Sequence, residues 1–404
     1  MIGDRIFYAD FSGGGRIATF DALRADLAEA RSFPREIASA DPYRCFLDTI
    51  LSLLADEPVR FSDPSGGARS GADRAEAKNA GFSSAEEMLR AVAAPKRRWR
   101  ATLQTSGTAG RPKEAAHTFE SLARSTKVSA AHSGDVWGFA YSPTHIAGLQ
   151  VFLQALLNAN PIIRLFGLPR AEIFRAIELG KPTHISATPT FYRNLAPSGG
   201  EKFPFVRRAI FGGERFDPRA ASAAAEIFPN ARAKNVYAST EAGTVLSSDG
   251  EVFTVEGPSA ERVKIENGEL FLRGDALASA APAPGEWFAT GDCVETLSEN
   301  PLSFKFSARR GDFINSGGYK INPLEVEDAI RRIDGVLDAR VFARPSALLG
   351  SAVCAEVARA GQYPDEAQMR AILARELPKF KIPRVVEFRD SLAATPTGKL
   401  SRKI

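Results

Sequence analysis

The stretch Thr105-Ser106-Gly107-Thr108-Ala109-Gly110-Arg111-Pro112-Lys113 is the strongest local signal in the chain. Its two glycines let the backbone approach an anion closely, and its hydroxyl groups and its lysine are donors for phosphate oxygens. Its spacing and the position of its lysine differ from GxxxxGK[ST], the pattern of P-loop NTPases. A loop rich in Ser, Thr and Gly is often only a surface loop, so its meaning depends on the motifs that follow it.

Six further motifs follow this loop in order: Ser142-Pro143-Thr144-His145-Ile146-Ala147-Gly148-Leu149, Gly212-Gly213-Glu214, Tyr237-Ala238-Ser239-Thr240-Glu241, Thr290-Gly291-Asp292, Arg309 through Glu325, and Pro396-Thr397-Gly398-Lys399. Together with the loop they resemble the motif series of the superfamily of acyl/aryl-CoA ligases, adenylation domains and luciferases, which form acyl-adenylates. The resemblance spans residues 101–404. The segments Lys113–Thr118 and Pro143–Leu149 look closest to o-succinylbenzoate–CoA ligases.

Short apolar strands alternate with helical segments after residue 101, which is typical of α/β layering. The expected strands are Ala101–Leu103, Trp137–Tyr141, Thr183–Ala187, Val206–Phe211 and Lys234–Tyr237. With the resemblance, this pattern predicts a large layered α/β adenylate-forming domain over residues 1–308, with a shortened amino-terminal part and a β-rich segment near 250–306. Residues 309–404 are expected to form a small mobile α+β domain, with a hinge near Gly311.

Local signals predict several elements inside these domains. Asn267-Gly268 between two alternating stretches indicates a hairpin with a type I′ turn. Asn322 is expected to cap a helix that has Pro323 at its first position and Glu325 in a capping box. A second helix is expected from Asp365 to Leu377, and a helical stripe is formed by Leu47, Ile50, Leu51 and Leu54.

The resemblance implies a triphosphate site with magnesium. The loop is expected to hold the β- and γ-phosphates of ATP through Thr105, Ser106, Gly107, Thr108, Gly110 and Lys113. Glu241 is the expected Mg²⁺ ligand, since a hard cation binds a carboxylate and phosphate oxygens together, and Thr240 is expected to donate to the α-phosphate. The other histidines show no spacing typical of metal ligands and receive no role: His117, His132 and His184.

The resemblance also implies a nucleoside site. Tyr237 is expected to stack on the adenine, with Gly213 and Glu214 as the other wall. Asp292 is expected to accept hydrogen bonds from the ribose hydroxyls, and Arg309 to contact the ribose or a phosphate.

Two half-reactions on one site follow from the resemblance. Lys399 bridges the acyl carboxylate and the α-phosphate in the first, and His145 acts as a gate beside the carboxylate and the thiol path. Rotation at the hinge near Gly311 then brings in the loop of Gly317 and Gly318, which guides the pantetheine thiol of coenzyme A. Glycine at the hinge is compatible with this rotation because of its wide φ/ψ range.

Composition excludes several classes. The 404 residues carry 52 basic and 48 acidic side chains, and this net charge of +4 does not indicate nucleic-acid binding. The distant Cys45, Cys293 and Cys354 argue against disulfides and zinc, and each is expected to be a small buried hydrophobe. The absence of a secretory pattern and of an apolar run of about 18 residues predicts a cytoplasmic protein without membrane insertion.

Three functions remain open from the sequence. The first is an acid–CoA ligase that releases AMP and pyrophosphate. The second is a stand-alone adenylating enzyme that loads a carrier-protein phosphopantetheine, and the third is a non-catalytic nucleotide-binding protein, which the presence of Lys399 and Glu241 disfavours. The small or apolar segments expected to surround the acid favour an aromatic or medium aliphatic acid. Because few residues precede the loop, we expect the acid pocket either to be more open or to be completed by another subunit, as in a homodimer.

Overall fold

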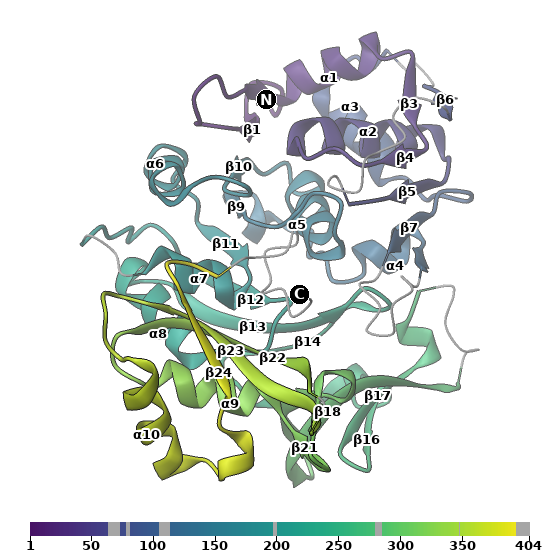
Figure 1. The fold of residues 1–404 in the computed structure, drawn as a ribbon. Helices are drawn as coiled ribbons and strands as arrows, with labels where there is room; N and C mark the ends of the chain where they lie inside the picture. The colour runs from purple at the N-terminus through teal and green to yellow at the C-terminus, as the bar shows by residue number, and fades with distance from the viewer. Residues whose placement is uncertain are drawn as a thin grey trace. The chain divides into compact units, whose positions relative to one another are not determined.

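The computed structural model describes residues 1–63, 73–77, 81–104, 114–196, 200–278, 285–346 and 348–392. The chain forms two compact units (Figure 1). The first contains Met1–Arg262 and Leu272–Phe288, and the second contains Val263–Phe271 and Ala289–Ile404. Each unit has an apolar core of its own.

An eight-stranded sheet organises the first unit, in the order β14-β13-β12-β11-β9-β10-β1-β2. The strands from β13 to β1 run parallel to their neighbours, and β14 and β2 are antiparallel edges. Their bounds are Gly243–Ser248 (β14), Arg232–Ser239 (β13), Arg208–Gly212 (β12), His184–Ala187 (β11), Trp137–Phe139 (β9), Ile162–Arg164 (β10), Ile6–Ala9 (β1) and Ile17–Thr19 (β2). The helices between the parallel strands are α5 (Ile146–Leu157), α6 (Arg170–Gly180), α7 (Pro189–Leu195) and α8 (Pro218–Ile227). The predicted α/β class is confirmed.

A smaller sheet in the same unit has the order β4-β5-β7-β8. Its strands are β4 (Glu36–Ile37), β5 (Val59–Phe61), β7 (Ala101–Gln104) and β8 (Glu114–His117). Around it lie α1 (Phe20–Glu29), α2 (Pro42–Ala55), α3 (Ala85–Ala93), α4 (Phe119–Ala123) and the pair β3 (Ser32–Pro34) and β6 (Arg74–Glu76). The short strand β15 (Phe253–Thr254) belongs to another sheet. The antiparallel partners Gln104 and Glu114 end β7 and begin β8, so the two residues that flank the predicted phosphate loop lie opposite each other.

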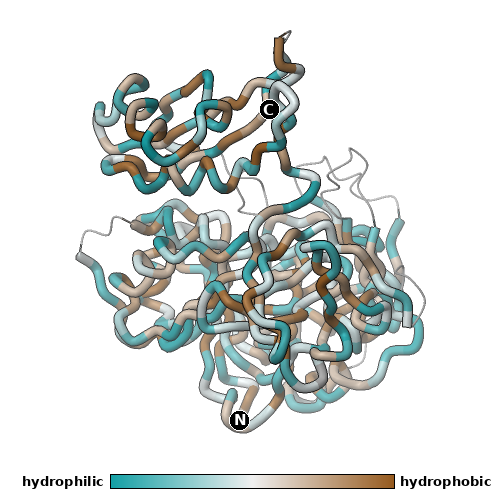
Figure 2. Tube along the Cα trace, turned by 90° about the horizontal axis from the view of Figure 1, so that it is seen from below, coloured by the Kyte–Doolittle hydropathy of each residue, from teal (hydrophilic) through white to brown (hydrophobic). Residues whose placement is uncertain are grey.

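Aromatic side chains fill the core of the first unit. Phe46 on α2 stacks on Phe152 of α5 at 4.4 Å and meets Phe139 of β9 edge-on at 5.1 Å. Such pairs stabilise a core beyond the area they bury. Hydrophobic and hydrophilic stretches alternate along the chain trace (Figure 2), as expected of helices and strands that turn one side to a core and the other side to solvent. Of the predicted apolar stripe of α2, Leu47, Ile50 and Leu51 are buried and Leu54 is half-buried, but the helix is buried on its other sides as well.

In its described residues, the second unit combines β strands with two α-helices. The strands β19 (Leu302–Arg309), β18 (Trp287–Glu299), β17 (Glu269–Arg273) and β16 (Val263–Glu266) are neighbours in that order. A hairpin follows, made of β20 (Ile314–Ser316) and β21 (Tyr319–Ile321). The last sheet contains β22 (Val336–Ser346), β23 (Gly350–Arg359) and β24 (Val385–Arg389), and the helices are α9 (Pro323–Arg331) and α10 (Glu366–Glu376).

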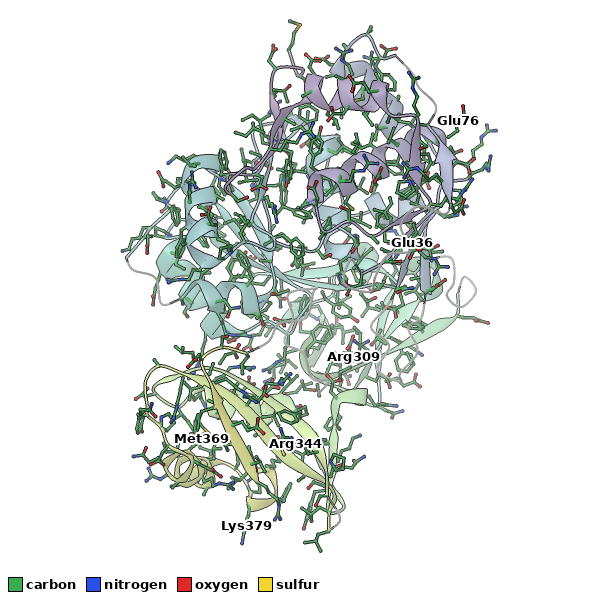
Figure 3. The ribbon with its side chains drawn as sticks, turned by 45° about the horizontal axis from the view of Figure 1, so that its top comes forward. Glu36, Glu76, Arg309, Arg344, Met369 and Lys379 are labelled. Carbon is green, nitrogen blue, oxygen red and sulfur yellow. The ribbon has the colours of Figure 1, made fainter. Side chains whose placement is uncertain are left out.

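Two local predictions in this unit are confirmed. Asn267 and Gly268 both have positive φ, at 51° and 71°, as a type I′ turn between β16 and β17 requires. The helix α10 occupies the predicted range and has a complete capping box at Asp365 and Gln368. Met369 of this helix is fully buried in the apolar core of the unit (Figure 3).

The capping box predicted for α9 is wrong in one half. Asn322 caps the helix, but its Oδ1 accepts a hydrogen bond from the backbone N–H of Leu324. The Glu325 carboxylate does not return a bond to the cap, because it forms an ion pair at 2.6 Å with Lys381 Nζ. A long-range charge partner has replaced a local one.

The cysteine prediction also needs a correction. All three cysteines are free, and Cys45 and Cys354 are buried as expected, but Cys293 is only half-buried. Among the described residues, no helix combines the length and the apolar character that a membrane span needs.

The predicted domain boundary between residues 308 and 309 remains a prediction. Packing assigns the strands β16 to β19 largely to the second unit, whereas the prediction concerns the point where the chain rotates. Gly311 lies in the 3-10 turn Arg310–Asp312, directly after β19.

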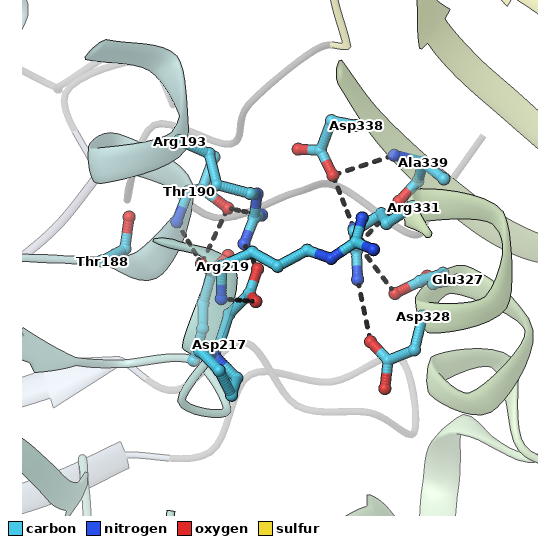
Figure 4. A network of polar contacts seen from close by, with 12 residues as sticks. Thr188, Thr190, Arg193, Asp217, Arg219, Glu327, Asp328, Arg331, Asp338 and Ala339 are labelled. Atoms are coloured by element: carbon cyan, nitrogen blue, oxygen red, sulfur yellow. Dashed lines mark hydrogen bonds and ion pairs between the residues drawn. The ribbon is translucent and has the colours of Figure 1, made fainter. Parts of the chain in front are cut away.

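A buried charge cluster holds α9 to β22 in the second unit (Figure 4). Arg331 Nε lies 2.8 Å from Asp338 Oδ1, and its Nη2 lies 3.2 Å from Glu327 Oε2 and 2.7 Å from the carbonyl oxygen of Ala339. Burial alone would lower the pKa of the Arg331 guanidinium, but Glu327 and Asp338 raise it above its usual range. The arginine therefore stays charged and neutralises two buried carboxylates.

Replacing this arginine is expected to destabilise the second unit strongly. Arg331→Ala leaves Glu327 and Asp338 without their counter-charge, so the free energy of unfolding should fall by about 3–5 kcal/mol in urea titrations. Arg332→Ala is the matched control, since Arg332 forms an exposed pair with Glu376 and its loss should cost less than about 1 kcal/mol. Equal effects of the two substitutions would contradict this account.

Candidate active site

The large sheet has a topological switch point at β9. Its neighbour on one side is β10, reached through α5, and its neighbour on the other side is β11, reached through α6. The connection that leaves β9 leads to β10 on one side, whereas the connection that leaves its other neighbour, β11, leads through α7 to β12 on the opposite side. In open α/β sheets, ligands bind at the carboxyl ends of the strands beside such a point.

The motif residues of the first unit lie at this carboxyl edge. His145 follows β9, Gly213 and Glu214 follow β12, and Thr240 and Glu241 follow β13. Gly212 at the end of β12 is the register partner of Val236, the residue before Tyr237. The fold thus brings together residues that are nearly a hundred positions apart in the chain.

His145 begins the helix α5 as its N-terminal cap residue and is half-buried. The turn before it is tight, since the backbone N–H of His145 donates to the carbonyl oxygen of Ser142 at 3.1 Å. A Cβ on Gly148 would lie 2.2 Å from that same carbonyl oxygen, so only glycine fits there. The spacing from His145 to Gly148 is therefore a packing requirement of the strand-to-helix turn.

Glu214 has a position that its motif did not reveal. Its Oε2 accepts hydrogen bonds from the backbone N–H and the hydroxyl group of Thr190, at 3.0 and 2.7 Å, in the first turn of α7. Arg193 extends this cluster by donating to Thr190 at 2.8 Å and pairing with Asp217 at 2.9 Å (Figure 4). The carboxylate of Glu214 therefore links β12 to α7. The predicted contact between Glu214 and adenine remains a prediction, and it would involve the backbone and the CH₂ groups of this residue.

Thr240 and Glu241 lie in the tight turn between β13 and β14. Two backbone carbonyls of this turn are anchored: that of Thr240 accepts from His117 Nε2 at 2.7 Å, and that of Glu241 accepts from the backbone N–H of Ala278 at 2.6 Å. The side chains are half-buried, and neither the Thr240 hydroxyl group nor the Glu241 carboxylate bonds to any residue within the described ranges. This is the arrangement expected of groups that bind a ligand.

The Glu241 carboxylate is a suitable ligand for the proposed magnesium ion. The described residues contain no group of three or more His, Cys, Asp and Glu side chains that could hold a metal ion. A single carboxylate with phosphate oxygens and water is a common arrangement for Mg²⁺, which rarely has an all-protein site. Any magnesium bound here would therefore depend on Glu241 and on the nucleotide.

The two residues predicted to bind the ribose are neighbours in the second unit. Asp292 and Arg309 are register partners on β18 and β19, with Arg309 Nε 3.6 Å from Asp292 Oδ1. The buried Glu269, which sequence reasoning missed, accepts from the backbone N–H of Gly291 at 2.9 Å and pairs with Arg310 at 2.6 Å. Its carboxylate holds the residues on either side of the Asp292–Arg309 pair.

Gly317 and Gly318 form the two-residue tip of the β20–β21 hairpin. Their φ angles of 56° and 83° lie in the left-handed region that favours glycine. The next residue, Tyr319, stacks on Phe380 with ring centroids 4.2 Å apart. A bulkier residue at either glycine would strain the tip.

Two groups of predicted residues lie outside the described residues. One is the phosphate loop, with Thr105, Ser106, Gly107, Thr108, Gly110 and Lys113, and the other is Lys399. Their roles remain predictions, and only the strands that flank the loop are described.

Comparisons with known proteins agree with this geometry. A family model described as AMP-binding enzyme matches residues 57–279, and one described as AMP-binding enzyme C-terminal domain matches residues 325–399. The 2-succinylbenzoate–CoA ligase of Listeria monocytogenes serotype 4b (strain F2365) is 29% identical over 324 residues, which cover 74% of this chain and 68% of that protein. The enzyme of the same name from Staphylococcus aureus (strain MRSA252) is 28% identical over 323 residues, 74% and 65% of the two chains.

Solved structures show the same fold. ATP-bound MatB from Rhodopseudomonas palustris has a TM-score of 0.68 at 20% identity and covers 98% of this chain and 94% of its own. The o-succinylbenzoate CoA synthetase from Bacillus subtilis, in complex with its acyl-adenylate intermediate, has a TM-score of 0.64 at 19% identity, with the same coverage.

Removing the charge of Glu241 is expected to weaken magnesium binding. Glu241→Gln should raise the Mg²⁺ concentration needed for acid-dependent pyrophosphate release by at least about tenfold, because the amide is a poor ligand for a hard cation. Glu251→Gln is the matched control, since Glu251 is exposed and lies beyond β14. An unchanged magnesium dependence in Glu241→Gln would remove Glu241 from the metal site.

Proposed function

Because this chain belongs to the AMP-binding enzyme family, we propose that it activates an aromatic carboxylic acid such as 2-succinylbenzoate with ATP and transfers the acyl group to coenzyme A. The chain is an AMP-forming acid–CoA ligase: the carboxylate attacks the α-phosphorus of ATP and expels pyrophosphate, and the thiol of coenzyme A then displaces AMP from the acyl-adenylate. The observation that carries the proposal is the anchored turn whose Thr240 hydroxyl and Glu241 carboxylate are left to a ligand.

The acid class is supported by the relatives and by the edge of the sheet. The relatives compared above bear the name of a ligase for 2-succinylbenzoate, an aromatic acid. At the carboxyl edge, the Tyr141 hydroxyl group donates to the carbonyl oxygen of Gly212 at 3.3 Å, and burial raises the pKa of Tyr141, so the phenol stays neutral. Tyr141 is buried, so its phenol supports the backbone of Gly212 at this edge and adds no charge there.

The protein groups act by placing charge where the reaction develops it. Glu241 would hold a magnesium ion, which would neutralise charge on the leaving pyrophosphate. Thr240 donates to the α-phosphate, and Lys399 is proposed to bridge that phosphate and the attacking carboxylate, where negative charge grows in the transition state. Asp292 and Arg309 hold the ribose in this proposal, so the α-phosphate is presented in one orientation.

The second half-reaction is proposed to use the second domain differently. Rotation of residues 309–404 about the hinge near Gly311 withdraws Lys399 and brings the hairpin tip at Gly317 and Gly318 toward the acyl-adenylate. The tip is narrow because both residues lack side chains, which suits a passage for the pantetheine arm.

A panel of acids tests the proposed substrate. Pyrophosphate release should be fastest with 2-succinylbenzoate or a related aromatic acid, and the thioester should form with free coenzyme A. If the thioester forms only on a carrier-protein phosphopantetheine, coenzyme A is not the acceptor. If the enzyme prefers an α-amino acid, the proposed class of acid is wrong. Sedimentation of the active species would show whether a homodimer is needed.

Lys399→Ala separates the two half-reactions. Adenylate formation should fall by about 100- to 1000-fold, because one preorganised charge at the α-phosphate is lost. Thioester formation from supplied acyl-adenylate should change little, since Lys399 has left the site by then. Lys403→Ala is the control, and full adenylation speed in Lys399→Ala would refute the assigned role.

A further inference from the structure

His117 is a buried histidine whose two ring nitrogens are both engaged. The side chain, at the end of β8, is fully buried. Its Nε2 lies 2.7 Å from the carbonyl oxygen of Thr240, and its Nδ1 lies 3.2 Å from the hydroxyl oxygen of Ser121. Because a carbonyl oxygen only accepts, Nε2 must carry the proton and donate it.

Burial keeps this imidazole neutral. Burial lowers the pKa of His117, and the positive charge of Arg124 lowers it further. The hydrogen bond to Thr240 and the negative charge of Glu241 act in the other direction, but the pKa remains below its usual value. A neutral ring with the proton on Nε2 has one donor and one acceptor. The donor is directed at Thr240, and the acceptor Nδ1 lies 3.2 Å from the Ser121 hydroxyl oxygen, whose one proton is also directed at the carbonyl oxygen of Thr118 at 3.1 Å.

The bond joins two parts of the proposed nucleotide site. His117 ends the strand that follows the phosphate loop, and its backbone pairs with Ala101 on the strand that precedes it. Thr240 and Glu241 carry the groups proposed for the α-phosphate and for magnesium. The hydrogen bond therefore spans 123 positions to connect the strand after the triphosphate loop with the metal-binding turn.

The rest of the turn is anchored by other means. The Glu241 carbonyl accepts from the backbone N–H of Ala278, and that segment is itself held by Arg124 Nη1, which donates to the carbonyl oxygen of Ala276 at 2.8 Å. With the carbonyls of residues 240 and 241 fixed from two sides, the peptide between them cannot rotate freely. The anchor on Thr240 is a side chain, so it can be removed without altering the backbone.

We infer that His117 is a positioning residue: its Nε2–H sets the orientation of the Thr240–Glu241 peptide relative to the phosphate-loop strand. This inference rests on the proposed function, which assigns the α-phosphate and magnesium to that turn. A small displacement of such groups from the reacting atoms costs rate far more than it costs acid binding.

Three variants isolate the donor. The amide nitrogen of His117→Gln reaches about as far as Nε2 and can donate to Thr240, whereas the shorter His117→Asn cannot reach it and His117→Leu has no donor. His117→Leu and His117→Asn should lower kcat for adenylate formation by about 10- to 100-fold, with KM for the acid within about threefold of the parent value. His117→Gln should restore kcat to within about fivefold, and His132→Gln, at a histidine outside the site, should match the parent protein.

The half-reactions and binding provide further tests. The loss in adenylate formation should exceed any loss in thioester formation from supplied acyl-adenylate, because the triphosphate and magnesium take part only in the first. By calorimetry, the gain in ATP affinity on adding Mg²⁺ should shrink at least about fivefold in His117→Leu but not in His117→Gln.

These outcomes separate the inference from the proposed function. If His117→Leu keeps the parent kcat and the parent magnesium effect, or if His117→Gln is as impaired as His117→Leu while both melt near the parent temperature, the positioning role is overturned. If the parent protein itself shows no magnesium-dependent ATP binding and no pyrophosphate release, the assignment of the turn fails, and the inference fails with it.

Discussion

The parallel arrangement of the strands from β13 to β1 is the constraint on which the first unit depends. A parallel sheet places the carboxyl ends of all its strands at one edge, and the crossovers around β9 open that edge at one point. His145, Gly213 and Thr240 each follow a different strand, yet all lie at this edge. No single segment could supply these groups, because a polar, ligand-facing site needs loops of different origin on a rigid support.

Precision at this edge comes from hydrogen bonds that end on the backbone. Tyr141 donates to the carbonyl oxygen of Gly212, and His117 and Ala278 fix successive carbonyls of the turn that carries Glu241. A side chain is positioned well only when its own backbone is held, since otherwise rotation of one peptide moves it by several ångströms. The Thr240 hydroxyl group and the Glu241 carboxylate can then keep a defined orientation although no protein group binds them within the described residues.

Local chemistry was predictable from the sequence, and long-range partners were not. The turn at Asn267 and the cap at Asp365 follow from the conformational preferences of a few adjacent residues, and the structure has both. The sequence predicts that Glu325 closes a capping box, but its carboxylate forms an ion pair with Lys381 instead. The bond from His117 to Thr240 could not be predicted for the same reason: its partners meet only after the sheet has formed, and a lone histidine carries no periodic or spacing signal.

Glu269 illustrates how the two kinds of information combine. The Asn267-Gly268 turn fixes the register of β16 and β17 and so determines where the residue after the turn begins its strand. That register places a buried carboxylate beneath the backbone of Gly291, next to Asp292, with Arg310 as its counter-charge. A buried carboxylate with both a backbone donor and an arginine is stable only while both partners stay in place. The Asn267-Gly268 turn, which the sequence reveals, therefore helps to determine where the proposed ribose-binding pair Asp292 and Arg309 lies.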